Sequence, residues 1–178
     1  MRAVLISINP KWCEKIANGE KTIELRKTIP SIERQFRCYI YETKRKQIER
    51  VDGCELTYHG RGKVIGEFVC DDIDKVHVFN DILYCVKNSQ ANKLGQMCLT
   101  IEEIKAYLGE NDGYNWHISQ LKIYDKPKHL SDFRKLCPYT NGTHCLENKC
   151  EYYCDYNGNC YYRVERPPQS WCYVEISE

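Results

Sequence analysis

The sequence predicts a single α+β domain built on a mostly antiparallel β-sheet or barrel, with two or three helices. The chain has 178 residues, the usual size of one domain. Short apolar or alternating runs typical of strands recur along it, whereas helical spacing is confined to a few short stretches. Internal repeats and low-complexity tracts are absent from the sequence, so we take the domain to span residues 1–178.

The first three predicted elements follow one another closely. Residues 3–8 are an apolar run that ends in an Asn-Pro pair, which predicts a buried strand and a turn. The proline can open a helix, and residues 11–18 keep helical spacing until an Asn-Gly pair stops it. Residues 21–26 alternate in polarity, which predicts a second strand.

Four more strands and one helix are predicted further along. The strand patterns cover residues 36–41, 63–69, 116–124 and 171–176. The third of them shifts in phase near Ser119. Thr100 with Glu103 three residues on forms a capping box, which predicts a helix over residues 101–108. The basic run at residues 44–46 is interpreted as a solvated loop.

The sequence composition indicates the cellular compartment and, through it, the expected state of the cysteines. No run of about 18 apolar residues is present, so we expect no transmembrane helix. Residues 1–10 lack the long apolar core of a signal peptide, so we expect a cytoplasmic protein. In a reducing compartment the 12 cysteines are expected to be metal ligands or buried thiols.

Charge is distributed unevenly along the chain. Residues 1–63 carry 14 Lys or Arg and 8 Asp or Glu, a net charge of +6. The remainder carries 12 and 17, a net charge of −5, and the two sum to the overall +1. A basic half beside an acidic half permits a positive patch that binds phosphates, although an ordinary solvated surface would look the same.

One motif carries a family resemblance. Residues 19–26 have the form G-x-K-x-x-E-x-R, on a predicted strand that follows an amphipathic helix. This resembles the signature of the ASCH family, a branch of the PUA-like superfamily. Further segments that look like the family's, in the same order, are residues 7–10, 66–68, 129–133 and 168–173. The resemblance covers roughly residues 1–133 and 164–176.

The resemblance implies a PUA-like β-barrel flanked by helices, with RNA bound in the cleft beside the motif. One branch with a similar layout is an amidohydrolase that deacetylates the modified nucleoside N4-acetylcytidine with a Lys, a Thr and a Glu. Lys21 matches that Lys and would be the catalytic residue if this chain is an enzyme. The position of the Thr holds Glu24, and this departure favours binding over catalysis.

The residues themselves are compatible with a ligand site. Glu24 and Arg26 lie two apart on one strand face and can pair, which would present the guanidinium fork to a phosphate or a base edge. Lys21 adds positive charge and, if desolvated, could act as a base or nucleophile. The alternative is an ion pair that only closes the rim of the barrel. Trp171 is expected in the core rather than as a platform for base stacking.

The predicted RNA or nucleoside site therefore combines the motif with polar residues near it. It consists of Ser7, Asn9, Trp12, Lys21, Glu24, Arg26 and Ser170. Turn capping is the alternative role for the first two, and core packing for the tryptophan.

Five cysteines crowd into a Cys-rich insertion at residues 134–165, before the last strand. Their spacing is C-x7-C-x4-C-x3-C-x5-C, in a polar stretch that cannot build its own core. Clustered thiolates that close short loops are what a structural zinc needs. The predicted ligands are Cys145, Cys150, Cys154 and Cys160, with Cys137 or His144 as the substitute. A loop of free thiols and disulfides formed after lysis remain alternatives, and the segment could also bind an unknown protein partner.

Overall fold

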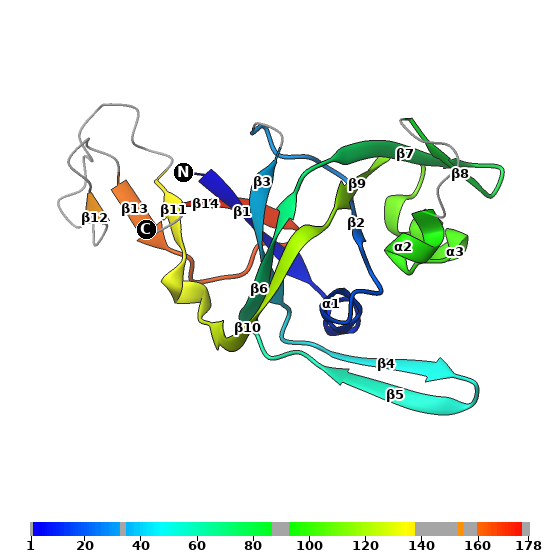
Figure 1. Ribbon diagram of the computed structural model, residues 1–178, viewed down its shortest axis with the longest axis horizontal. Coiled ribbons are helices and arrows are strands. Elements are labelled where there is room, and N and C mark those ends of the chain that lie inside the picture. Colours follow the sequence, from blue (N-terminus) through cyan, green and yellow to red (C-terminus); the bar gives the residue numbers. More distant parts are fainter. Residues whose placement is uncertain (1, 33–34, 87–92, 138–152, 155–159, 176–178) are drawn as a thin grey trace.

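The described part of the chain folds into three β-sheets and three short α-helices (Figure 1). The computed structural model describes residues 2–32, 35–86, 93–137, 153–154 and 160–175. The helices are α1 (Pro10–Ala17), α2 (Lys93–Met97) and α3 (Ile101–Leu108), with a 3-10 turn η1 (Leu130–Asp132). None of these helices is long and apolar enough to cross a membrane.

The largest sheet has eight strands in the order β10-β6-β3-β1-β14-β11-β13-β12. Their bounds are β1 (Arg2–Ile8), β3 (Phe36–Glu42), β6 (Lys63–Cys70), β10 (Ser119–Lys128), β11 (Arg134–Leu136), β12 (Tyr153–Cys154), β13 (Cys160–Arg163) and β14 (Trp171–Glu175). β1 runs parallel to β3 and antiparallel to β14, and the other pairings are antiparallel. The prediction of a mostly antiparallel sheet is confirmed.

β1 lies in the core because its apolar run is covered on both faces. Ile6 belongs to a cluster with Trp116 and with Ile16 of α1, whereas Leu5 packs in a second cluster with Phe133. Such burial on both sides is what a continuous apolar strand requires. α1 begins at a proline, as predicted, and it ends at Asn18, after which Gly19 adopts a φ of 77°.

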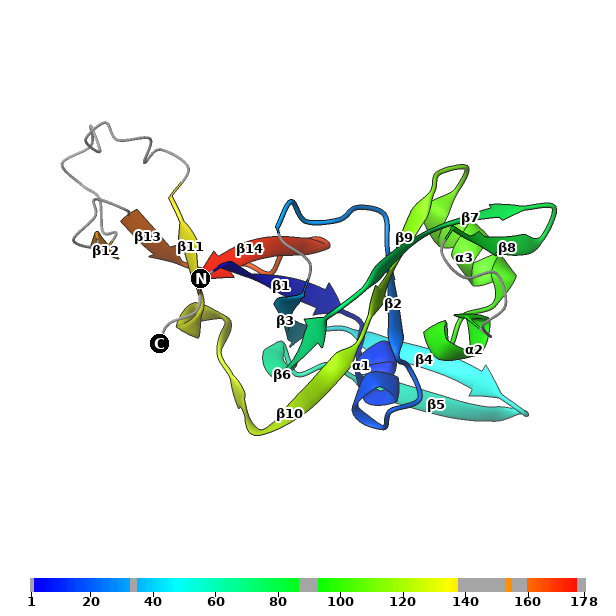
Figure 2. The same cartoon turned by 45° about the horizontal axis from the view of Figure 1, so that its top comes forward.

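A four-stranded antiparallel sheet has the order β2-β9-β7-β8 and meets α2 and α3 (Figure 2). Its strands are β2 (Ile23–Arg26), β7 (Ile73–Phe79), β8 (Ile82–Cys85) and β9 (Gly113–His117). Leu25 and Val76 pack with Ile104 and Leu108 of α3 in a third cluster. The predicted capping box of α3 is present: Glu103 N–H donates to Thr100 Oγ1 at 3.2 Å, and Thr100 N–H donates to Glu103 Oε2 at 2.9 Å.

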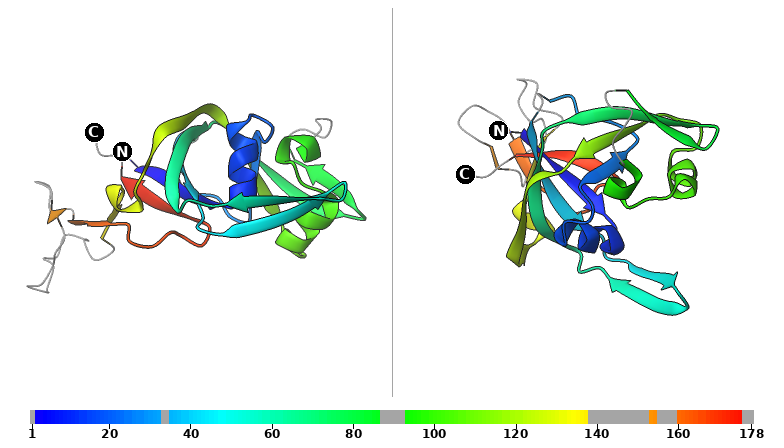
Figure 3. Two further views of the ribbon diagram at one scale, coloured as in Figure 1. Left: turned by 90° about the horizontal axis from the view of Figure 1, so that it is seen from below. Right: turned by 45° about the vertical axis from the view of Figure 1, so that its right-hand side comes forward.

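A two-stranded ribbon, β4 (Lys46–Val51) and β5 (Cys54–His59), projects beneath α1 (Figure 3). Its tip turns through Asp52 and Gly53, whose φ angles of 50° and 79° are those of a type I′ hairpin. Lys11 anchors the ribbon to α1, because its Nζ lies 2.7 Å from Glu49 Oε1. Lys44 and Arg45 form an exposed loop, as interpreted from the sequence, whereas Lys46 begins β4.

Three further differences from the sequence prediction concern the strands. The described strands pair as three open sheets and form no closed barrel among themselves. The pattern at residues 116–124 is two strands in two sheets, β9 and β10, and the break falls at the phase shift near Ser119. The Cys-rich insertion, expected to have no core of its own, adds β11, β12 and β13 to the end of the large sheet.

Candidate functional site

A cleft of about 760 Å³ opens where β1, β2, α1, α3 and the segment before β14 meet. The residues that line this cleft are Ser7, Ile8, Asn9, Trp12, Lys21, Glu24, Leu25, Arg26, Tyr41, Thr43, Lys44, Arg45, Leu99, Glu103, Tyr107, Pro167, Pro168, Gln169 and Ser170. All seven residues of the predicted ligand site are in this set. The structure thus brings together residues from five separate parts of the sequence.

The three charged residues of the motif form a buried triad in the wall of the cleft. Glu24 accepts from both neighbours: its Oε1 lies 2.9 Å from Arg26 Nη2, and its Oε2 lies 3.3 Å from Lys21 Nζ. The side chains are 2% exposed for Lys21, 9% for Glu24 and 7% for Arg26. The predicted Glu24–Arg26 pair is confirmed, and the carboxylate bridges two cations rather than one.

Arg26 also links β2 to β1 and to the segment before β14. Its Nη2 donates to the Ser7 carbonyl at 2.7 Å, and its Nη1 donates to Ser170 Oγ at 3.3 Å. Ser7 in turn donates its hydroxyl to the Pro168 carbonyl at 2.7 Å. These bonds hold the guanidinium in one orientation and position the segment before β14 against the end of β1.

Lys21 is held just as firmly. Its Nζ donates to the Met97 carbonyl at 2.7 Å, in addition to its ion pair with Glu24. A lysine that serves as a nucleophile must reach its substrate. The two contacts hold the Lys21 Nζ within the wall, and the side chain is only 2% exposed, which favours a structural and electrostatic role for Lys21.

Trp12 forms part of the wall between α1 and α3. Its ring is half-buried, with Lys11 Nζ 4.2 Å and Lys21 Nζ 5.3 Å from the ring centroid. Lys11 also lies 3.8 Å from Glu103 of α3. The tryptophan is therefore positioned by the cations around it.

The rim of the cleft carries two exposed cations. Lys44 and Arg45 lead from β3 into the ribbon, and neither forms an ion pair with another described residue. Thr43 beside them donates its hydroxyl to Asn9 Oδ1 at 3.2 Å, which fixes the Asn9 side chain at the start of α1. The two cations can therefore meet a ligand without first breaking an ion pair with a described residue.

Two tyrosines in the cleft supply neutral hydroxyl groups. Burial raises the pKa of Tyr41. Burial also raises the pKa of Tyr107, although the nearby Arg26 opposes the shift. Both phenols therefore keep their protons at neutral pH and can donate hydrogen bonds to a ligand.

Sequence reasoning missed several residues of the cleft. Tyr41, Tyr107 and Leu99 lie in ordinary apolar patterns, and nothing in their spacing marks them. Lys44 and Arg45 had a signal in the excess charge of residues 1–63, yet they were interpreted as a solvated loop. Trp171 is outside the cleft and packs against Trp116 with ring centroids 6.0 Å apart, in line with its expected core role.

The predicted zinc ligands are only partly within the described residues. Cys145 and Cys150 lie outside them. The backbone of Cys154 pairs with that of Cys160 across β12 and β13, and Cys137 N–H donates to the Cys160 carbonyl at 2.8 Å. Cys137 and Cys160 are buried. Among the described side chains no group of three His, Cys, Asp or Glu could hold a metal ion.

Comparison with solved structures places the fold. The chain is similar to the crystal structure of ASCH from Zymomonas mobilis, with a TM-score of 0.50 and 19% identity over 72% of this chain and 73% of that one. A serine-to-alanine variant of the same protein gives a TM-score of 0.53 and 16% identity over 97% and 88%. No family model and no curated protein matches the chain. The fold is therefore ASCH-like, which confirms the resemblance seen in the sequence at the level of the fold.

Proposed function

We propose that this protein binds RNA in the cleft beside the G-x-K-x-x-E-x-R motif. The observation that carries the proposal is the meeting of exposed cations, an aromatic wall and neutral hydroxyl donors in one cleft. Four basic residues and two acidic ones line it, and one of the two acids is already bound by Lys21 and Arg26. The excess positive charge suits a phosphate chain.

Each part of the cleft has a role in this proposal. Lys44 and Arg45 at the rim contact phosphates and do not read sequence. Trp12 offers a ring edge or face to an unstacked base, as in other readers of single-stranded RNA. Ser170, Tyr41 and Tyr107 supply hydrogen bonds to the base or the ribose. The volume accommodates a flipped nucleotide together with its sugar and phosphate.

Removing the two rim cations is expected to weaken RNA binding and to flatten its salt dependence. Fluorescence anisotropy with labelled single- and double-stranded 12-mers at 50 and 200 mM salt measures both. Two phosphate contacts to a single strand predict a loss of roughly sevenfold between these salt concentrations in the wild type. The double variant Lys44→Ala, Arg45→Ala is expected to lose most of that dependence and part of the affinity.

The matched control removes the same charge elsewhere. Lys122 and Lys126 are exposed on β10 and line no part of the cleft. Their double alanine variant is expected to bind RNA as the wild type does. Equal losses of RNA affinity in the two double variants would mean that the effect is general charge attraction. No binding by the wild type at 50 mM salt would refute the proposal.

The alternative function, deacetylation of a modified nucleoside such as N4-acetylcytidine, is tested on the same protein. The contacts of Lys21 with Glu24 and the Met97 carbonyl weigh against it. We expect no conversion of N4-acetylcytidine to cytidine when the two are separated by chromatography. Turnover that is lost in Lys21→Ala with the fold intact would establish the enzyme instead.

We further propose that the Cys-rich insertion binds one structural zinc. The backbones of Cys154 and Cys160 are directly opposed across β12 and β13, and Cys137, which follows β11, donates its N–H to the Cys160 carbonyl. These three of its five cysteine positions are therefore neighbours along the backbone, and clustered thiolates suit a tetrahedral zinc, whose binding would stabilise a segment that has few apolar residues. This support favours Cys137 as a ligand alongside Cys154 and Cys160.

Zinc content is expected to be about one atom per chain in reduced protein expressed with added zinc. Mass spectrometry of the metal measures it. The variant Cys160→Ser is expected to lose most of the zinc, whereas Cys54→Ser, an exposed thiol on the ribbon, is expected to keep it. A wild-type protein without zinc under these conditions contradicts the proposal.

A further inference from the structure

A row of charged side chains crosses the large sheet at the start of β1, the end that lies away from α1 (Figure 1). In strand order it is formed by Arg2 of β1, Glu175 of β14, Arg134 of β11 and Arg163 of β13, each directly opposite the next. Directly opposed residues on neighbouring strands carry their side chains on one face, with Cβ atoms about 5 Å apart. We call these four residues the arginine row.

The arginine row carries more positive charge than its carboxylate can offset. Three arginines stand against one glutamate, and the Glu175 Oε1 lies 3.9 Å from Arg2 Nε. Arg134 and Arg163 are like charges in directly opposed positions, which is destabilising, and an anion bound between them would relieve the repulsion. Arg163 forms no ion pair with another residue in the described part of the chain. All three arginines are exposed, so the excess charge is open to a ligand.

The segment between β13 and β14 leads from the arginine row to the cleft (Figure 1). It is anchored at one end by the buried Val164, which follows Arg163 directly. At the other end the Pro168 carbonyl accepts the Ser7 hydroxyl, and residues 167–170 line the cleft. The row and the cleft are therefore held at the two ends of one short, fixed connection.

An RNA strand bound in the cleft can reach the arginine row. Arg2 and Ser7 are five residues apart on β1, so the row is about 17 Å from the cleft. A stacked strand rises about 3.4 Å per nucleotide, so roughly five nucleotides cover this distance. The connecting segment carries Glu165 as well as Arg166, both exposed, so the attraction comes from the row itself.

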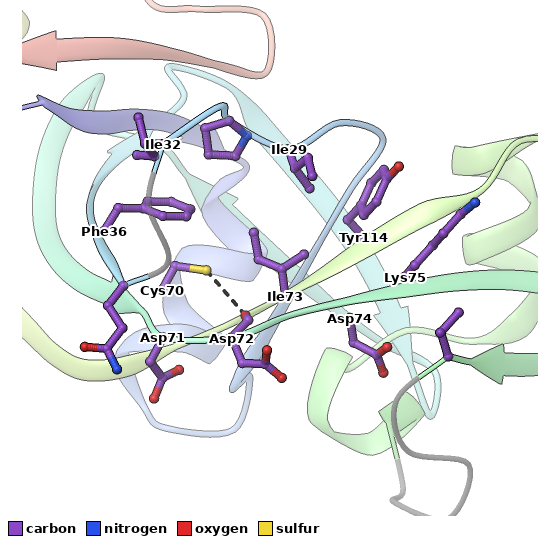
Figure 4. A pocket seen from close by; sticks show the side chains of 13 residues that line it. Ile29, Ile32, Phe36, Cys70, Asp71, Asp72, Ile73, Asp74, Lys75 and Tyr114 are labelled. Atoms are coloured by element: carbon purple, nitrogen blue, oxygen red, sulfur yellow. Dashed lines mark hydrogen bonds between the residues drawn. The ribbon is translucent and has the colours of Figure 1, made fainter.

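A second pocket, of about 300 Å³ and beside β7, offers no comparable place for phosphates (Figure 4). Asp71, Asp72 and Asp74 are among its lining residues, with Lys75 as the one cation. The charge of Lys75 is offset, because its Nζ lies 2.6 Å from Asp112. Like charges in close contact oppose binding, so a strand that leaves the cleft is favoured toward the arginine row.

We propose that the arginine row binds backbone phosphates of the same RNA strand whose neighbouring nucleotides occupy the cleft. This inference rests on the proposed function and narrows its ligand to a strand of roughly six nucleotides or more, in place of a free nucleoside. Arg134 and Arg163 hold a phosphate between their guanidinium forks. Such contacts add affinity and orientation without reading sequence. The Cys-rich insertion supplies both arginines, and this gives the insertion a part in RNA binding.

Two lengths of RNA test the proposal. Labelled single strands of 3 and 12 nucleotides are compared by anisotropy with the wild type and the double variant Arg134→Gln, Arg163→Gln. The variant is expected to bind the 12-mer roughly fivefold more weakly at 50 mM salt and to lower the slope of log affinity against log salt by about 1.4, in addition to the part that comes from the rim cations. It is expected to bind the 3-mer as the wild type does, because the shorter strand cannot reach the row.

A milder variant guards against a loss of structure. Arg163→Gln alone breaks no ion pair with a described residue, so its urea midpoint is expected to match that of the wild type. It is expected to show part of the loss for the 12-mer and none for the 3-mer. An equal loss for both lengths would overturn the proposal, since the effect would then not depend on reaching the row.

Two further variants separate the arginine row from the cleft. Lys44→Ala, Arg45→Ala is expected to weaken both RNAs, and Lys122→Ala, Lys126→Ala is expected to weaken neither. Wild-type affinity for the 12-mer in the row variant would overturn this inference and leave RNA binding in the cleft intact. Loss in the row variant without loss in the Lys44, Arg45 variant would contradict the proposed function. A poly-glutamate peptide that binds through the same arginines more tightly than RNA would also overturn the inference, because an acidic protein would then be the occupant.

Discussion

Replacing Glu24 by alanine is expected to destabilise the protein by about 3–5 kcal/mol, because it leaves two buried cations without their shared counter-charge. Glu24 bridges Lys21 at 3.3 Å and Arg26 at 2.9 Å, and each of the three side chains is at most 9% exposed. The remaining carbonyl acceptors, Met97 and Ser7, cannot offset two charges. Urea denaturation of the wild type and variant measures the difference.

The control is a Lys–Glu ion pair that is more exposed to solvent. Glu49 lies 2.7 Å from Lys11, but its side chain is 31% exposed. Exposed pairs contribute roughly 0–1 kcal/mol, so Glu49→Ala is expected to change the stability by no more than that. A loss below about 1 kcal/mol for Glu24→Ala would show that water reaches the triad and screens it.

Replacing the whole triad by apolar residues is expected to leave the fold intact and to reduce RNA affinity by roughly tenfold to a hundredfold. The variant is Lys21→Met, Glu24→Leu, Arg26→Met. Apolar residues of similar volume often replace a buried ionic group at little cost, and the lost bonds to carbonyls cost about 1 kcal/mol each. The urea midpoint reports stability, and anisotropy with the 12-mers reports affinity.

This variant separates the two explanations of the triad. Retained stability with lost binding means that the charges are kept for the ligand. A folded variant that binds RNA as tightly as the wild type would mean that the triad serves the scaffold alone and that the rim cations carry the affinity. The Lys122→Ala, Lys126→Ala protein again serves as the reference for changes in total charge.

The sequence correctly predicted those elements that depend mainly on interactions between residues close together in the chain. The apolar run of β1, the proline and Asn-Gly signals around α1 and the Thr100–Glu103 box of α3 each depend on contacts within a few residues. The ribbon β4–β5 was missed because its strands carry exposed charged residues in place of an alternating apolar face. Its Asp-Gly turn was the available signal.

The motif residues of the candidate site could be predicted from the sequence, but the other residues that line the cleft could not. Glu24 and Arg26 share a strand face by their spacing alone. Tyr41 and Tyr107 reach the cleft only because β3 pairs with β1 and α3 packs against β2, and such packing has no local pattern in the sequence. The same holds for β7 and β8: their alternation is visible in the sequence, but the helices that cover one side of the sheet decide which side chains stay exposed.

The pairing of β1 with both β3 and β14 has a consequence for how the protein forms during synthesis. Ile6 pairs with Trp171, so β1 gains β14 as a neighbour only after Trp171 has left the ribosome. Until then the apolar run from Ala3 to Ile8 has an unpaired edge, which nascent chains commonly need chaperones to shield. Contacts of such large sequence separation slow folding. Because Ser7 and Ser170 meet through this same pairing, the cleft is complete only after β14 has joined the sheet.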